Sequence, residues 1–112
     1  MRFCLLLLQV LLILFSELSA KAETVEVEIF KSAFIPAVVK VQKGDIVRWV
    51  NKEEVLHTVT SGKAPIHDEK FNANFLVKEY EIKIDGPAGV IDYFCAIHNA
   101  TMRGVIVVVD KK

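Results

Sequence analysis

Apolar and polar residues alternate along most of the chain after its first twenty-two residues. The alternation is clearest in residues 25–29 and 80–84, where single polar residues separate the apolar ones. This spacing places the apolar side chains on one face of a β-strand, whereas a helix would repeat them every three to four residues. No stretch of this part has a convincing helical period. The pattern therefore predicts an all-β fold.

Further strand-like runs are short and separated by turn residues. Lys43-Gly44 and the Gly- and Pro-containing residues 85–89 are typical of turns, and residues 62–74 are expected to form a long loop. The other expected strands are residues 38–41, 45–51, 57–60, 90–95 and 105–109. Seven or so short strands in one small domain predict a Greek-key antiparallel β-sandwich. The pattern alone does not distinguish an immunoglobulin-like sandwich from other families.

The first twenty-two residues differ from the rest and are predicted to be a signal peptide that is removed. Arg2 is followed by an apolar run over residues 4–15, and cleavage is expected after Ala22 or, alternatively, after Ala20. A retained membrane anchor is the other interpretation, but the run is short and Glu17 follows it closely. The domain is then residues 23–112, exported to the periplasm and without stable membrane insertion.

Length, charge and cysteine content narrow the possible functions. The 112 residues suffice for one domain with a modest core. Lysine plus arginine and aspartate plus glutamate number 14 each, so the balance gives no support for nucleic-acid binding. Of the two cysteines, Cys4 lies in the predicted signal peptide, which leaves Cys95 without a disulfide partner. A free thiol is prone to oxidation in an oxidising compartment, which favours a metal-bound Cys95.

Three metal-binding side chains lie close together near the C-terminus. Cys95, His98 and Met102 occupy eight consecutive residues, between one strand-like run and another. Thiolate and thioether sulfur are soft ligands and imidazole is borderline, a combination that suits copper. Two histidines, one cysteine and a distant axial methionine form the blue-copper arrangement. A second histidine would have to come from elsewhere, and His57 is the candidate.

The ending Tyr-Phe-Cys-x-x-His-x-x-x-Met-Arg-Gly, followed by a Val/Ile-rich strand, resembles the cupredoxins. These are the type 1 (blue) copper proteins, and the similarity is greatest to their amicyanin- and plastocyanin-like branch. Residues 48–51 and 56–61 also resemble the segment that carries the first histidine ligand in that family. The resemblance extends over essentially the whole chain after the signal peptide.

The resemblance implies a ligand set and a function. It implies one copper ion bound by His57, Cys95 and His98, with Met102 as the weak axial ligand. A one-electron carrier is expected, a monomer that docks redox partner proteins near His98 and has no catalytic activity of its own. Two departures from the family concern residues that tune the reduction potential. Thr58 stands where many relatives have asparagine, and three residues separate His98 from Met102.

Other interpretations remain open at this point. Periplasmic copper storage or delivery would use the same fold and ligands, and a zinc-binding or purely structural sandwich is less favoured. A cysteine, histidine or methionine can also simply fill a core or lie on a surface. His67, in the loop, is expected to be exposed and not a ligand. The charged residues 52–54 are expected to form a solvated turn, and the Asn99-Ala100-Thr101 sequon is taken as a chance match.

Overall fold

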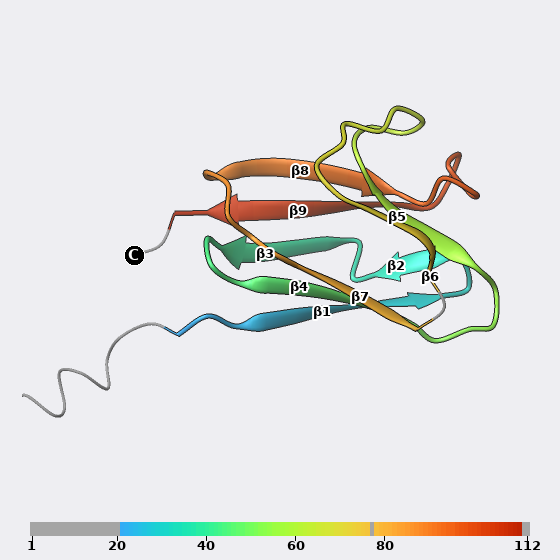
Figure 1. Ribbon diagram of the computed structural model, residues 1–112, viewed down its shortest axis with the longest axis horizontal. Helices are drawn as coiled ribbons and strands as arrows, with labels where there is room; N and C mark the ends of the chain where they lie inside the picture. The colour runs from blue at the N-terminus through green and yellow to red at the C-terminus, as the bar shows by residue number, and fades with distance from the viewer. Residues whose placement is uncertain (1–20, 77, 111–112) are drawn as a thin grey trace, which may run out of the picture.

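The structure is a computed structural model that describes residues 21–76 and 78–110. The predicted signal peptide lies outside the described residues except for its last two positions. Within the described part, nine strands form two sheets (Figure 1). The four-stranded sheet has the order β2 (Ala33–Ile35), β1 (Thr24–Phe30), β4 (Ile46–Asn51) and β7 (Glu79–Lys83). The five-stranded sheet has the order β3 (Val38–Gln42), β9 (Arg103–Val109), β8 (Gly89–Phe94), β5 (His57–Ser61) and β6 (Asn72–Leu76).

The predicted β-sandwich is confirmed, although its sheets are mixed and not wholly antiparallel. β1 pairs with β4, and β3 pairs with β9, in parallel. The remaining strand pairs are antiparallel. Among the described residues, no helix is long and apolar enough to cross a membrane.

Two short strands, β2 and β6, were not predicted from the sequence. β2 has three residues, too few for an alternation to be read. β6 begins inside the expected loop, and its sequence starts with Asn72-Ala73-Asn74, residue types that usually indicate turns. Both strands lie at sheet edges, where one side needs no strand partner and polar residues are common.

The inward side chains of both sheets form one core, as the alternation predicted. In β9, for example, Gly104, Ile106 and Val108 are buried while the residues between them are not. Around Trp49, which is fully buried, the rings of Phe71, Tyr80 and Tyr93 pack with centroids 5.2–5.8 Å away.

Gly104 is required for this packing. A Cβ at this position would overlap the ring of Tyr93 in the paired strand β8. The missing side chain at Gly104 lets this large ring fill the core just below the turn that follows β8. That turn, residues 95–102, carries three of the four predicted metal ligands. It joins β8 and β9 at the right-hand end of Figure 1.

β5 differs from the other strands because all five of its residues are buried. It lies between β8 and β6. At its far end Ser61 Oγ accepts a hydrogen bond from the backbone N–H of Phe71, so the loop that follows β5 folds back onto the strand. A strand enclosed in this way has little freedom to move, which suits it to carry His57 at its first position.

Candidate metal centre

His57 is fully buried, and a carboxylate holds its outer ring nitrogen. The His57 Nε2 atom lies 2.7 Å from Glu53 Oε1. The Glu53 carboxylate also accepts hydrogen bonds from the backbone N–H groups of Lys31 and Ser32, at 3.1 and 3.0 Å. These two residues form the turn between β1 and β2, and both have positive φ angles near 50°, a conformation typical of tight hairpins.

The hydrogen bonds to Glu53 have an electrostatic consequence. The backbone N–H of Ser32 is the main cause of a lowered pKa of the Glu53 carboxyl, and the bond from His57 acts in the same direction. Donors that favour the charged form keep this group ionised at neutral pH. An ionised Glu53 accepts the proton on Nε2, so the tautomer of His57 leaves Nδ1 free to bind a metal.

Residues 95–102 fold into a tight turn that brings the other metal-binding side chains together. The backbone N–H groups of Thr101 and Met102 both donate to the carbonyl oxygen of His98, at 3.2 and 2.9 Å. The N–H of Cys95 donates to the carbonyl oxygen of Met102 at 3.0 Å, which closes the loop at its base. Cys95 and Met102 are fully buried, while His98 is half-buried.

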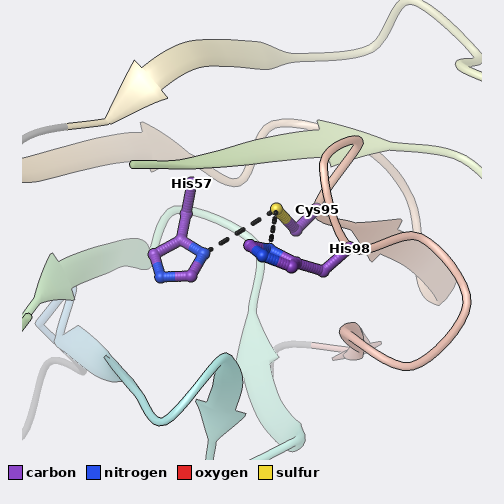
Figure 2. Close-up of side chains that lie close together, drawn as sticks. All are labelled: His57, Cys95 and His98. Carbon is purple, nitrogen blue, oxygen red and sulfur yellow. Dashed lines mark hydrogen bonds between the residues drawn. The ribbon is translucent and has the colours of Figure 1, made fainter. Parts of the chain in front are cut away.

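The three strongest donors converge on one point (Figure 2). The distance from Cys95 Sγ to His98 Nδ1 is 3.5 Å, and that to His57 Nδ1 is 3.9 Å. A trigonal metal with bonds of about 2.3 Å to sulfur and about 2.0 Å to nitrogen would hold such atoms roughly 3.7 Å apart. The two imidazole rings stand 5.2 Å apart, between their centroids, and are tilted by 49°. The donors therefore match a trigonal His₂Cys site in number, type and spacing.

Thr58 contacts Cys95 from the strand that carries His57. Its backbone N–H points at Cys95 Sγ, 3.4 Å away, and its hydroxyl oxygen accepts the N–H of Ala96 at 2.7 Å. A donor aimed at the sulfur stabilises the negative charge of a thiolate. Thr58 thus makes both contacts at the position where the resemblance leads one to expect asparagine.

The structure places the remaining predicted residues as follows. Met102 is buried in the ligand-bearing turn and belongs to the core cluster. His67 is exposed, as predicted, and does not join the cluster of donors found among the described residues. Glu53 was predicted to lie in a solvated turn; this is wrong, because its carboxylate contacts the buried ring of His57. Its position four residues before His57 could have indicated a contact with that histidine. It lies, however, in a run of three charged residues, 52–54, which is typical of an exposed turn.

The solvent side of the centre is apolar. Leu56 and Ile97 are 45% and 49% exposed, and Val55 is 49% exposed. Ala96 and Ala100, on either side of His98 in the sequence, are also exposed. Large apolar side chains at a surface often indicate a site of protein contact. Here they belong to the two segments that carry the histidines.

Comparisons with known proteins agree with this geometry. The model of the cupredoxin-like domain family matches residues 3–108. The chain belongs to the cupredoxin-like family. It is 33% identical over 88 residues to amicyanin from Paracoccus versutus, in an alignment that covers 78% of this chain and 66% of that protein.

Solved structures of amicyanin have the same fold. A Cu(I) form of one amicyanin variant has a TM-score of 0.66 and 26% identity, over 84% of this chain and 88% of that one. Another Cu(I) variant has a TM-score of 0.65 and 28% identity, over 77% and 82%. The cupredoxin resemblance is thereby confirmed, and the donor set of this cupredoxin is that of a type 1 copper site.

Proposed function

We propose that this cupredoxin is a one-electron carrier that works in the periplasm. The observation that carries the proposal is the convergence of Cys95 Sγ with the Nδ1 atoms of His57 and His98 inside a rigid sandwich. The similarity to amicyanin, whose Cu(I) forms are among the matching structures, supports the same function. Bound copper would supply the Cu(I)/Cu(II) couple.

In this proposal each residue has a defined role. Cys95, His57 and His98 would bind the metal, and Met102, which is buried in the same turn, would be a fourth, weaker ligand. Glu53 and Thr58 hold His57 and Cys95 in place before the metal arrives, so the geometry changes little between oxidation states. The half-buried ring of His98 is the exit for the electron, and the apolar surface at Leu56 and Ile97 contacts the redox partner.

The chain is proposed to have no catalytic activity of its own and to act as a monomer. Four protein ligands around one metal leave no open position for a substrate. Removal of residues 1–22 is proposed to accompany export. The N-terminal sequence of the protein recovered from the periplasm tests this, because it should begin at Lys21 or Glu23; a chain that retains Met1 would contradict it.

The site is tested by visible absorption of the mature domain after addition of Cu(II). A Cu(II)–thiolate site should give an intense visible band, which ascorbate bleaches reversibly. Cys95→Ser is the matched control because it is nearly isosteric and lacks the sulfur, and it should give no such band. Absence of the band in the unaltered protein would contradict the proposal.

Copper storage or delivery is the second candidate, with the same ligands. The two are separated by the rate at which a Cu(I) chelator removes the metal. A carrier with fixed ligands should cycle many times between oxidation states before it loses copper. Loss of copper within one or two cycles would favour delivery.

A further inference from the structure

A line of polar side chains runs from the metal-binding turn to the edge of the five-stranded sheet. The hydroxyl oxygens of Thr58 and Thr60 are 2.9 Å apart, and Thr60 donates to Asn72 Oδ1 at 2.8 Å. Asn72 Nδ2 in turn donates to Asn74 Oδ1 at 2.9 Å. Ala96 is at the other end, where its N–H donates to Thr58 Oγ1. The line therefore crosses from the turn after β8, through β5, to the edge strand β6.

The two threonines lie on one face of β5 and are shielded from water. Thr58 and Thr60 are each 4% exposed, and they alternate with His57 and Val59, which face the other way. Directly opposite Thr60, β6 places Asn72 and β8 places Phe94, which is only 2% exposed. Hydrogen bonds in such a dry setting are stronger than on a surface, and an unpaired hydroxyl there is unfavourable.

The direction of each hydrogen bond follows from its neighbours. The Asn72 carbonyl oxygen can only accept, so Thr60 uses its single hydroxyl proton there. Thr60 must then accept the proton of Thr58. Thr58 has no second hydroxyl proton, so it accepts the N–H of Ala96. The series runs one way, from Ala96 to Asn72, and each bond polarises the next.

Thr58 links this series to the sulfur. Its hydroxyl is bonded to the peptide group that follows Cys95, and its own N–H points at Cys95 Sγ. The orientation of the Thr58 hydroxyl depends on Thr60, and that of Thr60 depends on Asn72. We propose that Thr60 and Asn72 are positioning residues for the metal centre, which fix Cys95 through Thr58 although neither contacts a donor atom in the described interactions.

The proposal rests on Cys95 being the metal ligand of the proposed function, but it makes a claim about the metal-free chain as well. Asn72 is exposed at the edge of the sheet, so the series connects the sulfur to a surface away from the turn that carries His98. A substitution at this edge should therefore alter the reduction potential and the visible band of the bound metal.

The experiment compares Thr60→Val, which is nearly isosteric but has no hydroxyl, with Thr60→Ser, which keeps it. In the metal-free protein, amide hydrogen exchange at Ala96 should be about tenfold faster in Thr60→Val, the equivalent of one weakened hydrogen bond. In the copper-loaded protein, the reduction potential and the visible band should shift, and the chelator should remove copper about tenfold faster. Thr60→Ser should restore all of these values.

Two further variants keep the test decisive if Thr60→Val does not fold. Asn72→Ala removes the final acceptor at an exposed position and should shift the same quantities in the same direction, by less. Asn74→Ala is the matched control. Asn74 is also in β6 but lies one hydrogen bond beyond Asn72, so this variant should resemble the unaltered protein. The proposal is overturned if Asn72→Ala leaves Ala96 exchange and the potential unchanged, or if Thr60→Ser behaves like Thr60→Val. Absence of the visible band in the unaltered protein would instead contradict the proposed function, whatever the metal-free exchange shows.

Discussion

The two histidines of the centre belong to segments that are held in different ways. His57 is fully buried, and contacts from distant parts of the chain fix it through Glu53, Lys31 and Ser32. His98 is half-buried, and its turn is closed by hydrogen bonds among residues 95–102 themselves. One half of the site is therefore built by the fold, and the other by a short local turn. The difference separates an anchored, buried histidine from one that reaches solvent.

The largest effect should come from removing each imidazole in turn. Both His57→Gly and His98→Gly should lose the visible band of the copper-loaded protein. Added imidazole should restore the band only in His98→Gly, because that side of the centre opens to solvent while the His57 side is closed. Titration with imidazole, followed by absorption, checks this. Equal restoration in both variants would show that the two halves do not differ as described.

A smaller effect should follow from loosening the anchor without removing a ligand. Glu53→Gln keeps the size of the side chain but removes the charge that accepts the His57 proton. Copper affinity should fall about 10- to 100-fold, as is usual when the hydrogen-bond partner of a metal-binding histidine is lost. Glu54→Gln, at the exposed neighbouring position, is the control and should change little. Competition with a chelator measures the copper affinity of both variants. If Glu53→Gln binds copper as tightly as the unaltered protein, Glu53 does not support His57 as described.

The smallest effect at neutral pH should come from the core beneath the turn, at Tyr93. Its buried hydroxyl makes no hydrogen bond to another described residue, so Tyr93→Phe should change the free energy of unfolding by only about 1 kcal/mol or less. Burial raises the pKa of Tyr93 to about 12. The neutral phenol therefore makes its full contribution to the free energy of unfolding below about pH 10, the usual pKa of tyrosine. That contribution is lost as the pH rises from there towards 12.

Urea unfolding of the metal-free protein at pH 8 to 12 tests this contribution. The unaltered protein should lose on the order of 2 kcal/mol more than Tyr93→Phe across that range. Tyr80→Phe is the comparison. Because Tyr80 is less buried, this substitution should reduce the loss of stability at alkaline pH by less than Tyr93→Phe does. Identical alkaline profiles for the unaltered protein and Tyr93→Phe would contradict the assignment.

The sequence predicted most of what depends on local pattern. Cys95 and His98 could be identified because only two residues separate them and one turn brings them together. His57 lies 38 positions before Cys95, and nothing in its immediate sequence marks it as a ligand. The need for a second histidine and the family resemblance pointed to it. The fold class followed from the alternation, since inward and outward residues differ so clearly in strands such as β9.

The contacts that support the ligands were not predictable in the same way. Glu53 and Asn72 are polar residues in segments that look like turns, and their partners come from other segments of the chain. A hydrogen bond between strands depends on register, which the alternation of one strand does not reveal. β6 illustrates the point, because its residues gained a role only through their pairing with β5.

The hydrogen bonds from Lys31 and Ser32 to Glu53 also tie the metal centre to the N-terminal hairpin. The donors and the carboxylate are 22 and 21 positions apart, and they meet only after the hairpin of β1 and β2 has docked beside β4. Without that docking, His57 lacks the support that these hydrogen bonds give to Glu53. The N-terminal hairpin is therefore part of the metal centre's support, although it carries none of the proposed ligands.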